Sequence, residues 1–295
     1  MSNPLAAIQR VWLRRYWSPD ANARNEASRG RPAVVVTGGS EGIGLAIADR
    51  FAAAGHSIVL VARNEEKLEQ AAREIRARHG VEVQSIVLDL GERDAARRLV
   101  EAMTARALYA DVLVNNAAVG LAGEFTSHTE AEIARLIDLD VRAISLLTRA
   151  VLPAMCLRGS GGIINIASLA GYAPGPYQAA YYAGKAYVIA LTRAIAYEVR
   201  GQGVRVCVVT PGPVETRFHA RMGAETSIYR TWVPAASPAA IARSTYRGYL
   251  LGCRVIQPGL LTPVLALAMR LLPGIVLSPL IGTLLRPRGT EDARH

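Results

Sequence analysis

The sequence predicts a doubly wound α/β fold, in which one parallel sheet is covered by helices on both faces. Short runs rich in β-branched residues alternate with longer helical patterns from Pro32 to about Gly259, and a glycine-rich turn joins the first run to the first helix. Strand–helix alternation requires crossover connections, which make the strands parallel. We therefore expect one three-layer α/β/α domain over 32–259, preceded by a basic extension, 1–31, and followed by an apolar one, 260–295.

Seven runs have the length and composition of buried strands. They span residues 33–37, 57–61, 83–88, 112–115, 163–167, 204–209 and 254–257. Gly55 and Gly80 lie where the first two crossover helices should end, because glycine readily adopts the left-handed conformation of a helix C-cap. Thr129 and Glu132 form a capping-box pattern, which predicts the start of a long helix before the fifth strand.

Composition places the chain among folded globular proteins, with 51% hydrophobic and 20% charged residues. Three widely spaced cysteines fit neither a disulfide framework nor a zinc site, which favours a reducing, cytoplasmic compartment. Histidines and carboxylates lack metal-ligand spacing, so we expect no metal. No apolar run reaches the ~18 to 20 uncharged residues of a transmembrane helix, and arginines interrupt the place where a secretory signal would have its apolar core.

The charge balance is strongly basic. The chain has 34 lysines and arginines against 24 aspartates and glutamates, a net charge of +10. Residues 1–32 alone hold six arginines and two acidic residues. Such a leader can bind anionic lipid or nucleic acid, or remain a solvated arm. The sequence contains no zinc-finger spacing, RNA-recognition signature or basic zipper, so we expect no nucleic-acid partner.

A glycine-rich turn follows the first predicted strand and opens the first helix. It reads Thr37-Gly38-Gly39-Ser40-Glu41-Gly42-Ile43-Gly44. Its Gly-x3-Gly-x-Gly spacing is one residue longer than the generic Gly-x-Gly-x-x-Gly fingerprint. Glycines let backbone amides approach a pyrophosphate, and the helix N-terminus adds a dipole that favours negative charge. A plain tight turn is the alternative, but the position between a strand and a helix favours a dinucleotide site.

The end of the second predicted strand bears on which dinucleotide is bound. Proteins that bind NAD usually place an acidic residue there for the ribose 2′-hydroxyl, whereas this chain has Arg63. A guanidinium can pair with a 2′-phosphate, so we favour NADP(H) and keep NAD(H) as the alternative. Arg63 could also merely open the next helix, and Glu41 in the turn is unfavourable near phosphates.

Tyr181 and Lys185 are four residues apart in a helical stretch over 178–200, so their side chains share one face. The chain has only two lysines, so a lysine at 185 indicates a need for a compact ammonium. An adjacent ammonium favours the phenolate, which would lower the tyrosine pKa from its usual value of ~10. Ser168 follows the fifth strand, where its hydroxyl can bond a substrate oxygen or simply close a turn.

The chain resembles the short-chain dehydrogenase/reductase family over about residues 30–260. The resemblance rests on the glycine turn, Asp89-Leu90, Asn115-Asn116-Ala117-Ala118, Ser168, Tyr181-x3-Lys185 and Pro211-Gly212-Pro213-Val214-x-Thr216, in that order. It implies a Rossmann fold that binds NAD(H) or NADP(H). It further implies that Tyr181 is the acid/base, that Lys185 holds the nicotinamide ribose and lowers the tyrosine pKa, and that Ser168 orients the carbonyl.

The same resemblance implies particular cofactor contacts. Asp89 would meet the adenine, Asn115 would support the cofactor strand and Thr216 would contact the carboxamide. The expected cofactor-binding residues are Thr37, Gly38, Ser40, Glu41, Gly42, Ile43, Gly44, Arg63, Asp89, Leu90, Asn116, Ala117, Ala118, Tyr181, Lys185, Pro211, Gly212, Val214 and Thr216.

Two residues depart from the family pattern. Ala118 stands where the family usually has glycine, so its methyl group must fit beside the cofactor. Asp140 aligns with the asparagine that normally completes a proton relay through an ordered water. An aspartate keeps the size and an acceptor but loses the amide donor. We hypothesise that Asp140 takes the place of the asparagine in catalysis with an altered pH optimum.

Both ends of the chain are richer in apolar residues than a solvated extension requires. Residues 260–285 are almost wholly apolar except Arg270, but prolines divide them into pieces too short to span a bilayer. Near the N-terminus, apolar residues recur at helical spacing beside arginines, at Leu5, Ile8, Trp12 and Tyr16. One interpretation is peripheral attachment to the inner face of a membrane. The other is packing on the core or on a partner subunit of a homo-oligomer.

Together these features predict an NADP(H)-dependent oxidoreductase that interconverts an alcohol and a ketone or aldehyde. Residues 217–240 resemble the family's substrate lid, and their apolar side chains favour a hydrophobic, lipid-like substrate or serve to anchor the loop. These side chains are Phe218, Met222, Tyr229 and Trp232. The alternatives are NAD-dependent alcohol oxidation in the same fold, and a nucleotide-binding scaffold or sensor without useful turnover.

Overall fold

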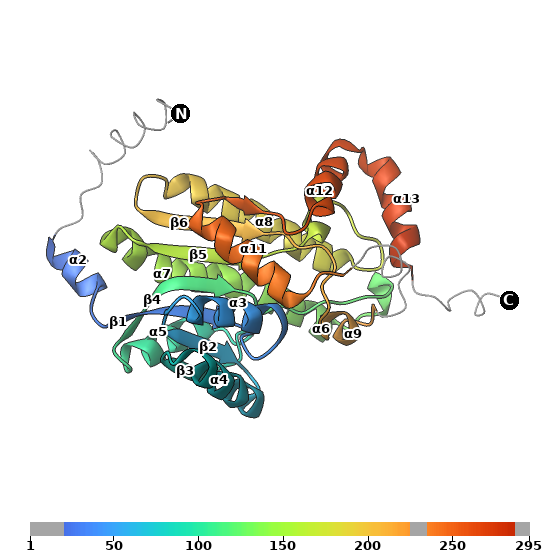
Figure 1. The fold of residues 1–295 in the computed structure, drawn as a ribbon. Coiled ribbons are helices and arrows are strands. Elements are labelled where there is room, and N and C mark those ends of the chain that lie inside the picture. Colours follow the sequence, from blue (N-terminus) through green and yellow to red (C-terminus); the bar gives the residue numbers. More distant parts are fainter. Residues whose placement is uncertain (1–20, 225–234, 287–295) are drawn as a thin grey trace.

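The computed structural model describes residues 21–224 and 235–286. Seven parallel strands form one sheet in the order β3-β2-β1-β4-β5-β6-β7 (Figure 1). They are β1 Arg31–Thr37, β2 Ile58–Ala62, β3 Val83–Val87, β4 Leu108–Asn115, β5 Gly161–Ile166, β6 Val204–Val209 and β7 Val255–Ile256. All seven predicted strands are confirmed, although β4 begins four residues earlier than expected and β7 has only two residues. The central strands are almost continuously apolar because both faces of the sheet are covered.

Helices cover the sheet on both faces, as a doubly wound fold requires. One layer holds α3 Gly42–Ala52, α4 Glu65–His79 and α11 Pro238–Leu250, which share a core cluster with one face of the sheet. The other layer holds α5 Ala95–Thr104, α7 Ile144–Arg158 and α8 Ala179–Glu198. The two apolar clusters account for most of the buried core, and they fix the sheet rigidly between the layers.

The strand order reverses between β1 and β4, and this is where an open α/β sheet forms a crevice at its carboxyl edge. Thr37, the last residue of β1, ties the two strands together there. Its hydroxyl donates to the Val114 carbonyl at 3.2 Å and accepts from the amides of Asn116 and Ala117 at 2.9 and 3.1 Å. The loops that follow β1 and β4 are therefore held at fixed positions beside each other.

The predicted helix boundaries are largely confirmed. Gly80 caps α4 with a φ of 67°, and Thr129 and Glu132 form the complete capping box of α6 Glu130–Ile137. Gly55 lies three residues beyond the end of α3, also at positive φ. The long helix expected before β5 is interrupted by a π-helical segment, η2 Asp138–Ala143, between α6 and α7. Such segments occur often at functional sites.

Both ends of the described chain pack against the α/β body. Helix α2 Ala21–Ala27 lies against α7, where Arg158 donates to the Ala27 carbonyl at 3.0 Å. At the other end of the molecule, α12 Leu261–Leu271 and α13 Gly274–Leu285 form a projecting hairpin (Figure 1). Among the helices of residues 21–224 and 235–286, none is both long and apolar enough to cross a membrane. The predicted N-terminal apolar face and the lid residues Tyr229 and Trp232 lie outside the described residues.

Candidate active site

The glycine turn adopts a conformation that only glycine accommodates at key positions. Gly38 and Gly42 have φ angles of 63° and 60°, in the left-handed region. A Cβ atom on Gly44 would lie 2.5 Å from Asn116 Nδ2 and closer still to the Gly38 carbonyl oxygen. The backbone thus closes tightly from β1 into α3, whose N-terminus faces the crevice. This geometry suits a bound pyrophosphate, as the sequence predicted.

A cavity of about 1080 Å³ lies at the carboxyl edge of the sheet. Most of the expected cofactor residues line it, namely Gly38, Ser40, Glu41, Gly42, Ile43, Arg63, Asp89, Leu90, Asn116, Ala117, Ala118, Tyr181, Lys185, Pro211, Gly212, Val214 and Thr216. Thr37 and Gly44 lie behind this wall and shape it through the contacts given above. The Ala118 methyl group is accommodated in the lining. The residues present therefore fit a dinucleotide.

Ser168, Tyr181 and Lys185 meet on one side of this cavity. Tyr181 and Lys185 lie one turn apart on α8, with Lys185 Nζ 5.4 Å from the centre of the Tyr181 ring. Ser168 follows β5 and begins the short helix η3 Leu169–Tyr172, and its hydroxyl is hydrogen-bonded to Tyr181. The two side chains on α8 point toward one another, so the expected constellation is assembled.

The electrostatics of Tyr181 differ from the sequence-based expectation. Desolvation of the phenol raises its pKa, Lys185 and the Ser168 hydrogen bond lower it, and Asp140 raises it again. The net pKa lies above the usual value, so the prediction of an unusually acidic phenol is wrong for this structure. Lysine acts in the predicted direction, but desolvation outweighs it. At neutral pH Tyr181 carries its proton.

Asp140 lies directly behind Lys185. One carboxylate oxygen is 2.8 Å from Lys185 Nζ, and the other accepts from the Val119 amide at 2.8 Å. The side chains of Asp140 and Lys185 are 0% and 3% exposed. Although burial lowers the pKa of Lys185, the charge and hydrogen bond of Asp140 raise it above the usual value, so the ammonium is retained. Burial raises the pKa of Asp140 against the opposing effect of Lys185. Asp140 thus makes a direct ion pair with the lysine.

The π-helical segment explains how Asp140 reaches the lysine. A π-turn holds more residues than an α-turn, so it shifts the side chains of η2 relative to those of α6. Asp140 points inward to α8, whereas Arg142 in the same segment points to the loop after β3. Arg142 donates to the Gly91 carbonyl at 2.6 Å and to Asp138 at 2.9 Å. One local irregularity therefore connects the proton-transfer residues with the loop that carries Asp89.

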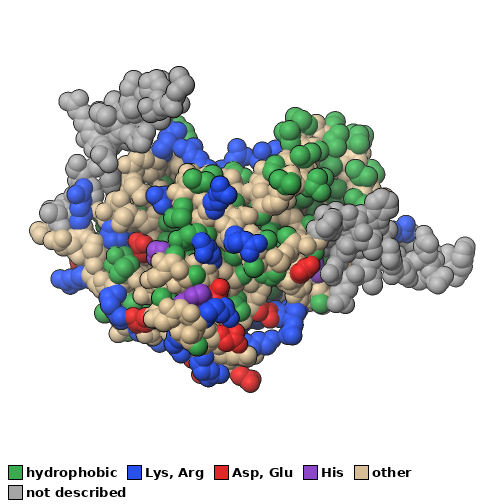
Figure 2. Space-filling view, viewed as in Figure 1, with side chains coloured by type: hydrophobic (Ala, Val, Ile, Leu, Met, Phe, Trp, Pro, Cys, Tyr) green, Lys and Arg blue, Asp and Glu red, His purple; other side chains and the backbone are tan. Residues whose placement is uncertain are grey.

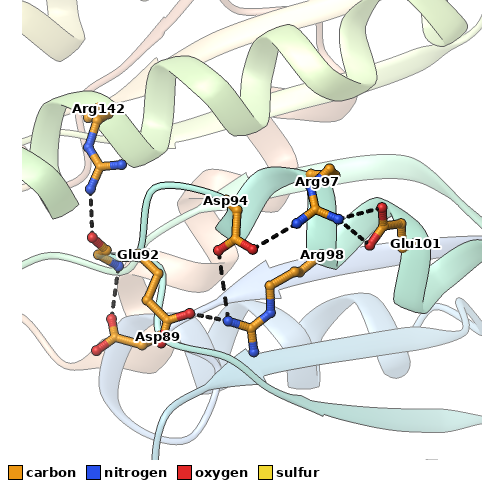
Figure 3. A network of polar contacts seen from close by, with 8 residues as sticks. Asp89, Glu92, Asp94, Arg97, Arg98, Glu101 and Arg142 are labelled. Carbon is orange, nitrogen blue, oxygen red and sulfur yellow. Dashed lines mark hydrogen bonds and ion pairs between the residues drawn. The ribbon is translucent and has the colours of Figure 1, made fainter.

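Asp89 is held by a network of polar contacts (Figure 3). It accepts from Arg135 at 2.7 Å and from the Gly91 amide at 2.8 Å. Although partial burial raises the pKa of Asp89, these hydrogen bonds and the nearby guanidinium groups bring it below its usual value. Around it, Arg98 pairs with Glu92 and Asp94, and Arg97 pairs with Asp94 and Glu101 (Figure 3). Asp89, at the expected adenine end of the cavity, is thus held by several partners as an ionised carboxylate.

Cations surround the end of the cavity nearest the glycine turn. Arg63 and Lys67 both line it, and Arg63 Nη1 lies 3.9 Å from Asp89. Glu41 pairs with Arg221 and lies 3.8 Å from Lys67. The hydrogen bond from Arg221 and the neighbouring cations lower the pKa of Glu41, despite its partial burial. Its negative charge is therefore balanced, which removes the objection that the sequence raised against phosphate binding.

Asn115 supports the floor of the site from within the sheet. Its amide donates to Asn165 at 2.8 Å and to Thr148 at 3.2 Å, and Asn165 in turn donates to Thr192 at 2.9 Å. All four side chains are buried. This chain of hydrogen bonds joins β4, β5, α7 and α8, in line with the supporting role that the resemblance implied.

The structure adds cavity residues that the sequence analysis missed. Several come from the C-terminal hairpin, namely Leu265, Met269, Ile281, Leu284 and Leu285, and another is Gln178 before α8. The four-residue spacing of Leu265 and Met269 marks one face of α12, but the outer face is equally apolar, so the sequence could not tell which face turns inward. Phe218, in α9 Phe218–Arg221, also lines the cavity and lies 5.6 Å from the Tyr181 ring, centre to centre.

A family model for short chain dehydrogenases matches residues 32–227. The chain belongs to the short-chain dehydrogenase/reductase family. Similar curated proteins include a short chain dehydrogenase of Pseudocercospora fijiensis, 38% identical over 63% of this chain and 60% of that one. Sulfoacetaldehyde reductase 2 of Chromohalobacter salexigens is 36% identical over 68% and 82% of the two chains. Very-long-chain 3-oxoacyl-CoA reductase of Anas platyrhynchos is 36% identical over 62% and 60%.

Solved structures of other proteins share this fold. A short-chain dehydrogenase from Sphingobium yanoikuyae in complex with NADPH has a TM-score of 0.72 and 31% identity, and the match covers 78% of this chain and 88% of that one. A bulky-bulky ketone specific alcohol dehydrogenase from Comamonas testosteroni has a TM-score of 0.68 and 27% identity over 78% and 87%. In residues 21–224 and 235–286, no group of His, Cys, Asp or Glu side chains is arranged to hold a metal ion.

Proposed function

We propose that this family member is an NADP(H)-dependent oxidoreductase that interconverts a ketone or aldehyde and the corresponding alcohol on a hydrophobic, lipid-like substrate. The observation that carries the proposal is the assembly of Ser168, Tyr181 and Lys185 on the wall of a cavity that also contains the glycine turn. Because Tyr181 is protonated at neutral pH, the arrangement favours its use as a proton donor in the direction of carbonyl reduction.

Each residue has a definable task in that reaction. A bound nicotinamide would supply the hydride for the carbonyl carbon. The hydroxyl of Ser168 donates a hydrogen bond that orients the substrate oxygen and stabilises its developing charge. Tyr181 transfers its proton to that oxygen and becomes a phenolate. The Lys185 ammonium stabilises the phenolate, and Asp140 keeps that ammonium charged and in place.

The choice of NADP(H) rests on charge at the end of β2. Arg63 and Lys67 line the cavity where a ribose 2′-phosphate would lie, and the three residues from 62 to 64 include no carboxylate. Guanidinium and phosphate form strong charge-assisted pairs. Asp89 also borders this region, so NAD(H) stays the alternative. The NADPH in the Sphingobium structure supports the first choice.

The choice of an apolar substrate rests on the lining beyond Tyr181. Phe218 and Met222 approach from one side, and the C-terminal hairpin contributes Leu265, Met269 and Ile281 from the other. A pocket lined in this way takes up apolar groups and leaves the polar contact to the reacting oxygen. The names of the Comamonas and Anas proteins, which refer to bulky ketones and to very long acyl chains, agree with such a substrate.

Cytoplasmic location, peripheral membrane contact and a homo-oligomeric state stay predictions from the sequence. The alternative function is a nucleotide-binding scaffold or sensor without turnover, which is considered because Asp140 replaces the asparagine usual in the family. The direct Asp140–Lys185 ion pair argues against it, because it keeps the ammonium beside Tyr181 that catalysis requires.

Replacement of Tyr181 tests the proposal. Tyr181→Phe removes the proton donor but keeps the ring, so turnover of NADPH with a panel of apolar ketones should fall by about 10²- to 10⁴-fold. Cofactor binding, measured by fluorescence titration, should persist. Tyr197→Phe alters an exposed tyrosine of the same helix and should leave turnover and cofactor binding unchanged. Full activity of Tyr181→Phe would refute the assignment.

A further inference from the structure

The C-terminal hairpin has two apolar faces. Its inner face packs on the α/β body through Leu277, Ile281 and Leu285, which form a cluster with Ala170 and Tyr182. Its outer face is exposed to solvent. Nine of the eighteen large apolar side chains that are exposed in the described residues lie within 260–280, namely Leu260, Leu261, Val264, Leu267, Leu271, Leu272, Ile275, Val276 and Leu280. Figure 2 shows this group as the green cluster over α12 and α13.

The exposed side chains form a continuous surface, which we call the hairpin surface. On α12, Leu261, Val264, Leu267 and Leu271 recur every three or four residues and so share one helix face. Leu260 and Ile275, at the two helix starts, are 95% and 85% exposed. A helix that is apolar on all sides is normally buried on all sides. Such a concentration on a soluble body marks a binding surface.

We propose that the hairpin surface inserts into the interface of a membrane that contains anionic lipid, and that the substrate enters the cavity from that membrane. The proposal deepens the proposed function by naming the partner through which an apolar substrate arrives. Each helix has only 11 or 12 residues, a length of about 17 to 18 Å, so the hairpin would lie in the plane of the interface rather than span the bilayer.

Charge favours anionic lipid over a second copy of this chain. The sequence contains seven arginines and no aspartate or glutamate from residue 226 to residue 290. On the hairpin itself the charged residues are Arg270, which stacks on the Tyr172 ring at 4.3 Å, and Arg286 at its end. Two copies that met through this surface would bring like charges together, whereas an anionic leaflet attracts them.

The hairpin also connects the surface to the site. On α12, Leu265 and Met269 line the cavity while Val264 and Leu267, on the opposite side of the helix, are exposed. On α13, Ile281 and Leu284 line the cavity and Leu280 is exposed. The helices of the hairpin thus carry cavity-lining side chains on one side and the hairpin surface on the other. A lipid-soluble substrate would remain in apolar surroundings on its way from a bilayer to Tyr181.

Vesicle binding of the full chain tests the proposal. The protein is mixed with vesicles of phosphatidylcholine alone or with phosphatidylserine, and the bound fraction is measured by flotation. We expect binding to the mixed vesicles that weakens in salt. The triple variant Val264→Gln, Leu267→Gln and Ile275→Gln should bind these vesicles at least about tenfold more weakly, because the transfer of apolar side chains from water drives insertion.

A matched triple variant controls for the loss of exposed apolar side chains elsewhere. Val100→Gln, Leu250→Gln and Leu251→Gln replace exposed residues outside the hairpin and should bind like the natural chain. No binding by the natural chain, or equal binding by both triple variants, would overturn the proposal. The proposal would also fail if light scattering showed a dimer for the natural chain and the control variant but a monomer for the hairpin variant. The hairpin surface would then join two copies of the chain.

Enzyme assays separate this inference from the proposed function. The hairpin variant should reduce a water-soluble ketone with NADPH as fast as the natural chain, but it should lose rate with a ketone dissolved in vesicles. Vesicle binding without any turnover would reject the proposed reaction and leave the membrane surface standing. Turnover without vesicle binding would support the proposed reaction and reject the membrane surface.

Discussion

At the scale of single residues, the buried ion pair of Asp140 and Lys185 distinguishes this site. An asparagine at 140 would be neutral, whereas the carboxylate places a negative charge 2.8 Å from the ammonium. That charge raises the pKa of Lys185 and, through space, the pKa of Tyr181. Burial of the phenol, with a smaller contribution from Asp140, keeps Tyr181 protonated, and Asp140 keeps Lys185 protonated, which suits a site that donates a proton.

This pair predicts a shifted pH profile for Asp140→Asn. Reduction requires protonated Tyr181, so the rate declines as the pH rises through the tyrosine pKa. Burial of the phenol is the main cause of the raised pKa of Tyr181 and the Asp140 charge adds to it, so removal of that charge lowers this pKa and should move the alkaline decline to lower pH. The measurement is the rate of NADPH-dependent reduction between neutral and strongly alkaline pH.

Asp138→Asn provides the comparison, since Asp138 belongs to the same π-helical segment but pairs with Arg142 near the surface. Its profile should match that of the natural chain. If the profile of Asp140→Asn also coincides with that of the natural chain, Asp140 has no influence on the proton donor and its assigned role is wrong.

The sequence pointed to Ser168, Tyr181, Lys185 and the unusual aspartate because their order and spacing are specific, and the structure brings the four side chains together. It did not predict the direction of the Tyr181 pKa shift. Spacing shows that an ammonium lies near a phenol, but desolvation depends on every element that encloses the phenol. The sequence also could not show whether Asp140 contacts Lys185 directly or through an ordered water.

At the scale of elements, the glycine turn is the least tolerant part of the site. Gly44→Ala improves the intrinsic helix propensity of α3 by ~1 kcal/mol. Its Cβ would nonetheless collide with the Gly38 carbonyl and with Asn116 Nδ2. The turn must open, so we expect NADPH to bind about 10- to 100-fold more weakly, as for an overpacking cost of ~1 to 3 kcal/mol.

Fluorescence titration with NADPH measures this effect. Gly274→Ala is the matched control, because a Cβ there meets nothing within 4 Å. Unchanged affinity in Gly44→Ala would show that the turn does not hold the cofactor. Weaker binding in both variants would point to a general effect of glycine replacement instead.

Element prediction succeeded where a single pattern decides the conformation. The strands were found because burial on both faces makes them continuously apolar. The first residues of β4 were missed, since Tyr109 and Asp111 break its apolar run. The π-helical segment was missed because α6, η2 and α7 share one helical pattern of side chains. The extra residue in the π-turn can be recognised only from the structure, in which the Asp140 side chain faces α8.

At the scale of the whole molecule, the site depends on two units that the sequence treated as separate. The α/β body supplies the turn, the proton donor and the ion pair, and the hairpin closes the cavity with Leu265, Met269 and Ile281. The sequence showed that 260–285 is apolar but not where it packs, because both faces of the hairpin are apolar. Its position follows from tertiary packing on η3 and α8.

Because the cofactor residues come from loops throughout the α/β body, bound cofactor should stabilise the molecule as a whole. A ligand that binds only the folded chain adds ~2.7 kcal/mol at 100 times its Kd. For a domain of this size, each kcal/mol raises the Tm by about 2 to 4 °C, so saturating NADPH should raise it by roughly 5 °C or more. NADH at the same concentration should raise it less, because it lacks the 2′-phosphate.

Arg63 should account for that difference. In Arg63→Ala the NADPH shift should fall to that of NADH, while the NADH shift stays the same, because only the 2′-phosphate loses a partner. Arg73→Ala removes an exposed arginine of α4 that does not line the cavity, and it should keep the full NADPH preference. Equal shifts with both cofactors in the natural chain would reject a preference for NADP(H), and a larger shift with NADH would favour the NAD(H) alternative. A preference that survives in Arg63→Ala would instead assign the recognition of the 2′-phosphate to Lys67, a cation of the first turn of α4 that also lines the cavity.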